Sequence, residues 1–193
     1  MQDALSVDGA VIEAHHLTKR YNGLLAAGDL SFVVRKGEFF GFLGPNGAGK
    51  TTTVRMLTGI IQPDNGSALL MGCPAGSIRA KQISGIVPEM AAYIDLSGLR
   101  NLMLMAELYG VPRREATTRA ANLLEALGLI NRKDSLVKEY SRGMKQRLIL
   151  SIALISEPEI LFLDEPTSGL DVQSARIIKE LCLNSTKMVK LFF

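Results

Sequence analysis

A glycine-rich segment that begins at Gly44 has the residue types and the spacing of a phosphate-binding loop. It reads GPNGAGKT and fits the pattern GxxxxGK[ST]. Glycines let backbone N–H groups curl around phosphate oxygens, and a following helix adds its positive N-terminal dipole. In such a loop Lys50 reaches the β and γ phosphates and the Thr51 hydroxyl holds Mg²⁺. The predicted phosphate contacts are Gly44, Pro45, Asn46, Gly47, Ala48, Gly49, Lys50, Thr51 and Thr52.

The alternative for this segment is a glycine turn that arose by chance. Glycine makes up about 7% of an average protein, so the four fixed positions should match by accident in a chain of this length about 1% of the time. The segment also follows an expected strand and opens an expected helix, as the motif requires. The sequence therefore predicts that this chain binds a nucleotide.

An apolar run that ends in two carboxylates is the second chemical feature. Residues 161–165 read LFLDE. At the end of a strand beside the phosphates, Asp164 would bind Mg²⁺ through water, and Glu165 would polarise the attacking water as a general base. Taken alone, the segment DEPTSG is equally consistent with a helix N-cap and a turn. We predict that Lys50 and Glu165 are the catalytic residues and that Asp164 and Thr51 are metal ligands.

Strand-like runs surround both features and predict a sheet. Residues 38–43, EFFGFL, are almost wholly apolar, as in a central strand covered on both faces, and they lead directly into the glycine loop. The other expected strands are 11–17, 30–34, 67–72, 83–88 and 160–166, with turns at 21–23 and 36–37.

Between residues 88 and 150 the pattern changes to helical periodicity. Apolar residues recur at three- and four-residue spacing over 99–109 and 115–127, with a break at 110–112 and a cap at Gly128. A third helix is expected from about Arg142 to Ile155. This segment is therefore predicted to be a helical insertion into a sheet core.

Two further motifs around the LFLDE run carry a resemblance to a known family. Residues 140–147, YSRGMKQR, resemble the ABC signature, and residues 168–171, SGLD, resemble the D-loop. With the glycine loop, this set in this order is similar to the ATP-binding subunits of ABC transporters. YSRGM is a variant of the usual LSGGQ and resembles subunits paired with ABC-2 type export permeases. Alone, YSRGMKQR would be read as an N-capped basic helix.

The resemblance implies an ATP sandwich dimer. In the family, the signature serine and glycine contact the γ-phosphate held by the opposite subunit, so Ser141 and Gly143 would act in trans. Arg142, Met144 and Asp171 are also expected to contact the nucleotide.

Two further residues enter through this resemblance. Tyr21 stands where the family places an aromatic ring that stacks on adenine, although a lone tyrosine in a turn is usually a half-buried ring. Glu89 stands where the family has a glutamine. Its carboxylate could ligate Mg²⁺ but would add negative charge near the γ-phosphate.

The implied fold class is α/β: a P-loop ABC-type ATPase with an antiparallel β subdomain and an α-helical insertion. We expect one ABC ATPase domain over 1–193, with a sheet core over 11–87 and 151–181, a helical signature subdomain over 88–150 and an anomalous tail over 182–193.

Composition excludes several other classes of protein. The net charge of +3 comes from scattered basic residues, so no nucleic-acid partner is expected. Cys73 and Cys182 have no CxxC spacing, which argues against a disulfide framework and a zinc site and fits a reducing compartment. No run of about 18 apolar residues occurs, so we expect no direct membrane insertion, and a membrane role needs a partner.

The two histidines and the tail do not match the rest of the family pattern. His15 and His16 precede the glycine loop and are predicted to be strand residues with one side chain facing out. The family carries a γ-phosphate-contacting histidine beyond the D-loop, after one more helix and strand, and the given sequence stops before that point. Read one base earlier, the codons of the tail permit LNKDGKTIF, which is similar to the family. One hypothesis is therefore a single-base deletion upstream of Asn184, near Cys182; a divergent end or a partial gene model are the alternatives.

Together these features imply an ATP-binding and ATP-hydrolysing subunit that energises an ABC membrane transporter of export type. ATP and Mg²⁺ are the implied cofactors. The implied partners are integral membrane permease subunits and a second ATPase domain, identical or not, at the cytoplasmic face of the membrane. The alternatives are a truncated, catalytically impaired fragment that binds nucleotide without driving transport, and a soluble ABC ATPase of translation or DNA repair. Soluble members generally carry two cassettes or a long coiled-coil insertion, and neither is found here.

Overall fold

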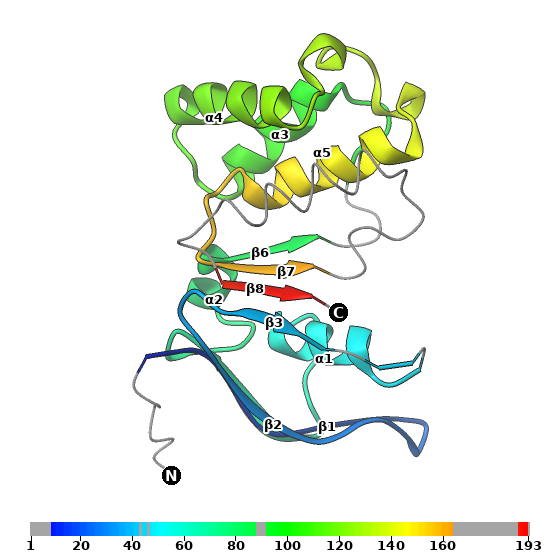
Figure 1. Cartoon of the computed structure of the whole chain (residues 1–193), viewed down its shortest axis with the longest axis vertical. Coiled ribbons are helices and arrows are strands. Elements are labelled where there is room, and N and C mark those ends of the chain that lie inside the picture. The colour runs from blue at the N-terminus through cyan, green and yellow to red at the C-terminus, as the bar shows by residue number, and fades with distance from the viewer. Residues whose placement is uncertain (1–8, 43, 46, 88–91, 164–188, 193) are drawn as a thin grey trace. The chain divides into compact units, whose positions relative to one another are not determined.

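The computed structural model describes residues 9–42, 44, 45, 47–87, 92–163 and 189–192 of the chain. Its contacts divide the chain into two units. Among the described residues, the first unit comprises 9–84, 159–163 and 189–192, and the second comprises 85–158. Figure 1 labels most of the elements of both units.

An antiparallel sheet forms the N-terminal part of the first unit, as the sequence predicted. Its strand order is β2-β1-β4-β5, and every neighbouring pair is antiparallel. The strands are β1 (Ala10–Tyr21), β2 (Leu24–Arg35), β4 (Asn65–Leu70) and β5 (Cys73–Pro74). In the turn between β1 and β2, Asn22 and Gly23 have φ values of 49° and 83°. Both are left-handed, which a two-residue hairpin turn requires and which explains the Asn-Gly pair.

A parallel ladder forms the other sheet of the first unit. The strands β3 (Phe39–Gly41), β8 (Val189–Phe192) and β7 (Ile160–Leu163) lie in that order. β8 pairs with Phe39–Gly41 on one side and with Ile160–Leu163 on the other, both in parallel. The sequence analysis predicted no strand in the tail, so the position of β8 between β3 and β7 (Figure 1) is a finding of the structure.

The strand before the glycine loop is less covered than its sequence indicated. Within the described part of the chain, β3 is the end strand of this ladder, Phe40 is half-buried and Gly41 is exposed. The Phe40 ring stacks on Phe32 of β2, with ring centroids 5.1 Å apart. The apolar character of this strand therefore reflects aromatic packing against the antiparallel sheet, because an offset ring pair is favourable beyond the area it buries.

The helix α1 (Lys50–Leu57) packs against β1, β2 and β4. It buries Thr53, Val54, Met56 and Leu57, which recur at helical spacing. Two short elements follow that the sequence analysis did not predict, namely β5 and α2 (Ile78–Ile83). The expected strand after them is β6 (Ser84–Val87), where the chain passes from the first unit to the second.

The second unit contains the three predicted helices. They are α3 (Gly98–Leu108), α4 (Arg113–Ala126) and α5 (Arg142–Leu154), with short 3₁₀ turns at Ile130–Arg132 and Val137–Glu139. Gly128 has a φ of 64°, so the predicted glycine cap after α4 is confirmed. Residues 151–158, which the sequence analysis placed in the sheet core, lie in this unit because α5 continues to Leu154.

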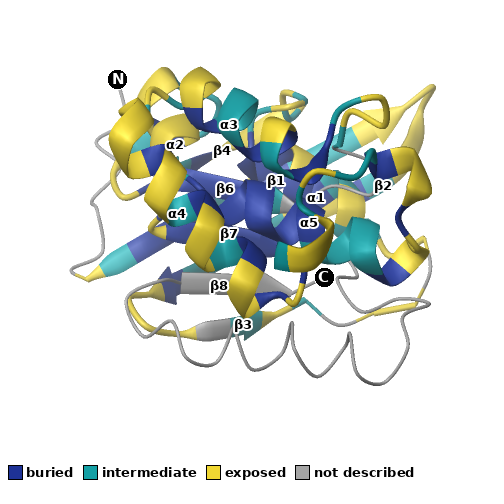
Figure 2. Ribbon diagram, turned by 90° about the horizontal axis from the view of Figure 1, so that it is seen from above, coloured by how far each residue is buried: buried dark blue, intermediate teal, exposed yellow. Residues whose placement is uncertain are grey.

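Burial follows one face of each surface helix. On α4 the buried residues are Ala116, Ala120 and Leu124, and Figure 2 shows the exposed positions that alternate with them. The strand β7 is buried at all four positions. No helix in the described part of the chain is long and apolar enough to cross a membrane.

Candidate nucleotide-binding site

The glycine loop is open to solvent and has the backbone geometry that the motif predicts. Gly47 and Gly49 have φ values of 85° and 83°, in the left-handed region that favours glycine. Gly44, Pro45, Gly47 and Ala48 are exposed, and the Ala48 N–H donates to the Pro45 carbonyl at 3.1 Å. The described part of the loop is therefore a tight, solvent-facing turn that a ligand can reach.

Lys50 closes this turn onto the start of α1. Its Nζ donates to the Gly44 carbonyl at 2.7 Å and to the Pro45 carbonyl at 3.2 Å. Lys50 is half-buried, and these two hydrogen bonds hold its ammonium against the backbone of the loop. Because a lysine ammonium has three donors, a further donor remains for an anionic ligand.

The N-terminus of α1 suits a phosphate. Its N-cap is Gly49, which offers no side-chain cap, and no acidic residue lies in the first turn. The first N–H groups of a helix have no intrahelical partner and carry a partial positive charge, so they attract an anion. Thr51 is exposed and Thr52 half-buried at this end, and the Thr53 hydroxyl anchors the helix by donating to the Gly49 carbonyl at 2.9 Å. The residues present therefore fit a bound polyphosphate.

Close packing against β2 adds a second reason for glycine at position 49. A Cβ on Gly49 would collide with the backbone carbonyl oxygen of Ala26. The glycine loop and β2 therefore touch here, and they can do so only without a side chain.

We expect Gly49→Ala to destabilise the protein more than Gly72→Ala. Gly72 has a similar φ of 75° but open space around its would-be Cβ, so alanine there costs only the left-handed conformation, about 1–2 kcal/mol. Alanine at position 49 adds the collision with Ala26 and should cost at least about 1 kcal/mol more. Urea denaturation of both variants measures the difference. Equal losses would show that the loop does not lie against β2.

Tyr21 lies beside this contact. It is the last residue of β1, pairs with Leu24 across the hairpin and is 44% exposed. Ala26, which touches Gly49, is two residues further along β2, a distance of about 7 Å along a strand. The hairpin therefore brings the predicted base contact and the predicted phosphate loop together within the first unit.

The predicted signature residues form the first turn of α5 in the second unit. Ser141 is the N-cap, and its Oγ accepts from the Met144 N–H at 3.3 Å. This is the N-capped helix that the sequence analysis weighed, and it leaves the hydroxyl proton of Ser141 available as a donor. Ser141 and Arg142 are exposed, Met144 is half-buried and Gly143 is buried.

Arg147 holds the start of α5 in place, a role that the sequence analysis did not assign. Its guanidinium donates to the Leu127 carbonyl at 2.9 Å and to the Gly143 carbonyl at 3.3 Å. The last carbonyls of a helix lack intrahelical partners, so a cation at the end of α4 satisfies one of them. The basic residue within the YSRGMKQR motif was the available signal.

Tyr140 fixes the residue before Ser141. It is 4% exposed, and its hydroxyl donates to the Arg132 carbonyl at 2.7 Å. A Cβ on Gly98 would collide with the Tyr140 hydroxyl oxygen, so the start of α3 packs directly on this ring.

Tyr140→Phe should lower the stability by about 1 kcal/mol at neutral pH, because the Arg132 carbonyl loses its donor. Burial raises the pKa of Tyr140 above its usual value of 10.0. The unfolded chain then ionises first, so this stabilisation is present below pH 10 and is lost as the pH rises beyond it. The gap between wild type and variant should therefore narrow above about pH 10 in urea titrations. Burial also raises the pKa of Tyr109. Tyr109 is present in both the wild type and the variant, so its effect on stability does not change the difference between them.

Five predicted site residues lie outside the described residues: Asn46, Glu89, Asp164, Glu165 and Asp171. The buried strand β7 ends at Leu163, directly before Asp164. In the described part of the chain, no group of three or more His, Cys, Asp or Glu side chains could hold a metal ion. The metal and general-base roles therefore remain predictions.

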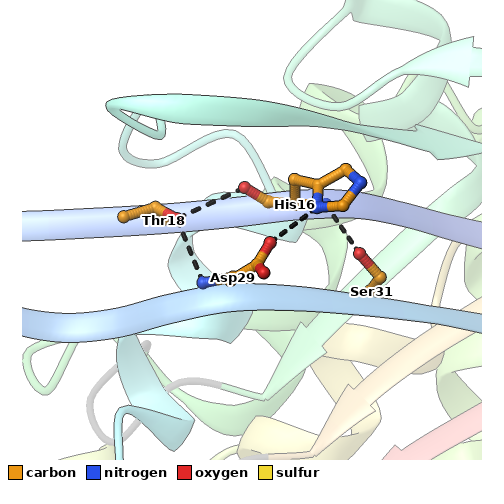
Figure 3. Close-up of polar contacts among 4 residues, drawn as sticks. All are labelled: His16, Thr18, Asp29 and Ser31. Atoms are coloured by element: carbon orange, nitrogen blue, oxygen red, sulfur yellow. Dashed lines mark hydrogen bonds and ion pairs between the residues drawn. The ribbon is translucent and has the colours of Figure 1, made fainter.

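The two histidines are strand residues of β1, as the sequence analysis predicted. His16 is exposed, and its Nδ1 lies 2.6 Å from the Asp29 carboxylate (Figure 3). His16 and Asp29 both have positive φ, and each sits at a shift in the β1–β2 register. The Ser31 and Thr18 hydroxyls accept from the backbone N–H groups of His16 and Asp29 at 2.9 and 3.0 Å. This cluster therefore satisfies the backbone of two β-bulges.

An exposed glycine loop between a strand and a helix, with a lysine at the helix start, defines a P-loop nucleotide-binding domain. The model of the ABC transporter family matches residues 27–168. The chain belongs to this family, which confirms the resemblance found in its motifs.

Similar proteins agree with this assignment. The linearmycin resistance ATP-binding protein LnrL of Bacillus subtilis is 41% identical over 94% of this chain and 60% of its own length. Nod factor export ATP-binding protein I of Burkholderia orbicola is 42% identical over 89% of this chain and 57% of its own. The doxorubicin resistance ATP-binding protein DrrA of Mycobacterium tuberculosis is 41% identical over 86% and 51%. The chain thus spans between half and two thirds of the length of these curated relatives.

Solved structures confirm the predicted fold class. An ATP-binding subunit of an ABC transporter superimposes with a TM-score of 0.85 at 29% identity, covering 94% of this chain and 78% of the other. CbiO1 from Clostridium perfringens, part of the ABC transporter complex cbiONQ, superimposes with a TM-score of 0.79 at 26% identity, covering 96% and 78%. The fold is therefore that of a P-loop ABC ATPase with an antiparallel β subdomain.

Proposed function

We propose that this chain binds and hydrolyses ATP and thereby energises an ABC membrane transporter of export type. The observation that carries this proposal is the exposed glycine loop, with Lys50 held on the Gly44 and Pro45 carbonyls at an uncapped helix start. The relatives named for drug resistance and Nod factor export support the direction of transport.

The nucleotide is proposed to lie along the β1–β2 hairpin and the start of α1. Tyr21 stacks on the base, and the segment 44–52 surrounds the phosphates with N–H groups and the Lys50 ammonium. Mg²⁺, when bound, neutralises phosphate charge; Thr51, Asp164 and Glu89 are the proposed ligands. Glu165 takes the proton of the attacking water.

A second ATPase domain is proposed to complete the site. Ser141, Arg142, Gly143 and Met144, together with Asp171, would face the γ-phosphate bound by the other subunit. The exposed positions of Ser141 and Arg142 at the start of α5 fit this role, because a helix N-terminus attracts an anion. The proposed partners are integral membrane permease subunits, and the proposed location is the cytoplasmic face of the membrane.

Two measurements on the purified chain test the proposal. The first is the Kd for MgATP, measured by calorimetry, and the second is steady-state phosphate release with MgATP, with and without EDTA. We expect saturable binding and phosphate release that EDTA abolishes. A tagged chain extracted from its native cells in detergent should also retain an integral membrane protein.

Other outcomes would contradict parts of the proposal. Binding without phosphate release would favour the alternative of an impaired chain that binds nucleotide without driving transport. Retention of ribosomes or DNA in place of a membrane protein would favour the soluble class of ABC ATPases.

A further inference from the structure

Lys19, two residues before Tyr21, is held in one position by three partners. Its Nζ donates to the Asp64 carboxylate at 2.8 Å and to the Gln62 carbonyl at 2.9 Å. The same Nζ lies 5.9 Å from the centre of the Tyr21 ring, within the range of a cation–π contact. The Lys19 side chain is only 17% exposed, so this arrangement is well enclosed for a lysine.

Asp64 is in turn bound to the end of β1 by its backbone and its carboxylate. Its N–H donates to the Thr18 carbonyl at 2.8 Å, and its second carboxylate oxygen accepts from the Arg20 N–H at 2.7 Å. The hydrogen bond from Lys19, followed by that from the Arg20 N–H, holds the pKa of Asp64 below its usual value. The carboxylate is therefore charged at neutral pH and is a firm anchor for the Lys19 ammonium.

Lys19 therefore links Asp64 to Tyr21, the residue that is expected to stack on the base. We propose that Lys19 and Asp64 are positioning residues that hold the Tyr21 ring for base stacking and so set the base-dependent part of the nucleotide affinity. This inference rests on the proposed function, because it assumes that Tyr21 contacts the base of ATP.

The physical reason is the freedom of a side chain at a hairpin tip. Tyr21 adjoins the Asn22-Gly23 turn, and its neighbours Leu24 and Leu25 are 77% and 56% exposed. Ordering a free side chain costs conformational entropy on binding, and a ring held in advance avoids that cost. Since an aromatic ring has two faces, the Lys19 ammonium can lie over one of them and leave the other for a base.

Lys19 acts through the ring in this proposal and does not touch the phosphates. This separates it from Lys50, whose ammonium lies on the glycine loop. A ligand that has phosphates but no base should therefore be insensitive to Lys19.

Calorimetric binding of two ligands tests this distinction. The ligands are MgATP and magnesium tripolyphosphate, and the variants are Lys19→Met, Asp64→Asn and Tyr21→Ala. Met keeps the length of the lysine stem and removes the charge. Lys138→Met is the matched control, because Lys138 pairs with Asp95 in the second unit, with N and O 3.7 Å apart.

We expect Tyr21→Ala to raise the Kd for MgATP by at least about fivefold, since base stacking is lost. Lys19→Met should raise it by about threefold, less than Tyr21→Ala does, and Asp64→Asn by less still, because the ring persists but is no longer held. The Kd for tripolyphosphate should stay within about twofold in all three variants. Retained tripolyphosphate binding also shows that each variant is folded at the loop.

Two results would overturn the inference. If Tyr21→Ala raises the Kd for MgATP and Lys19→Met leaves it unchanged, Lys19 does not position the ring. If Lys19→Met raises the Kd for both ligands equally, the loss of the Lys19 charge, or a change in folding, acts on the phosphate site instead of on the ring. If the wild-type chain binds neither ligand, the proposed nucleotide binding is itself refuted. This result differs from failure of the Lys19 inference, because it is seen in the wild type before any variant is compared.

Discussion

Lys50→Ala should abolish nucleotide turnover, with kcat/KM for MgATP lowered by at least about 100-fold, or about 3 kcal/mol of transition-state stabilisation. The variant removes the ammonium that the glycine loop holds through the Gly44 and Pro45 carbonyls. The fall in kcat/KM should therefore have two causes. The positive charge beside the phosphates is missing, and the loop no longer has the Lys50 hydrogen bonds that hold it. Phosphate release and the Kd for MgATP measure the two parts.

Lys81→Ala is the matched control for this prediction. Lys81 is an exposed lysine in the last turn of α2 and has no role in the proposed site. It should leave kcat/KM unchanged, so the comparison isolates the position of the charge from the net charge of the protein. Turnover by Lys50→Ala at the wild-type rate would refute the assignment of the loop.

Leu191→Pro should unfold the first unit or destabilise it by about 3 kcal/mol or more. β8 lies between β3 and β7, so the backbone N–H of residue 191 has a neighbouring strand whichever way it points. Proline removes this donor from the middle of the ladder and is rarely tolerated inside a sheet. Because folded proteins are stable by only about 5–15 kcal/mol, the loss should show as a large shift in the urea midpoint.

Leu191→Val separates the backbone effect from the change of side chain. Valine keeps the N–H and is favoured in strands, so it should shift the midpoint far less than proline. Wild-type stability in Leu191→Pro would show that the tail is not part of the sheet.

The hairpin and the helices show how much of the fold could be read in advance. Asn22-Gly23 predicted the first turn, because only a few residues adopt left-handed φ at low cost. The periodicity over 99–109 and 115–127 placed α3 and α4 within a few residues of Gly98–Leu108 and Arg113–Ala126. Short elements were missed: β5 has two residues and α2 has six, which is too few to establish a period.

In the candidate site, too, the local features were predicted from the sequence and the long-range contacts were not. The segment from Gly44 to Thr52 was predicted as a unit because its chemistry is local: Lys50 bonds a carbonyl six residues earlier in the chain. The close approach of Gly49 to Ala26 and the hold of Lys19 on Asp64, 45 residues later, were not predicted. Nothing in the local sequence specifies such distant partners.

By itself the sequence determined the fold class, the loop, the turn and the family, because each of these depends on residue types at short, regular spacing. Only the tertiary structure decided that Val189–Phe192 lies between β3 and β7, that β2 meets the glycine loop at Gly49, and that Lys19 reaches Asp64 and Tyr21. These contacts join residues far apart in the chain. They exist only where burial of the whole sheet offsets the entropy of bringing those residues together.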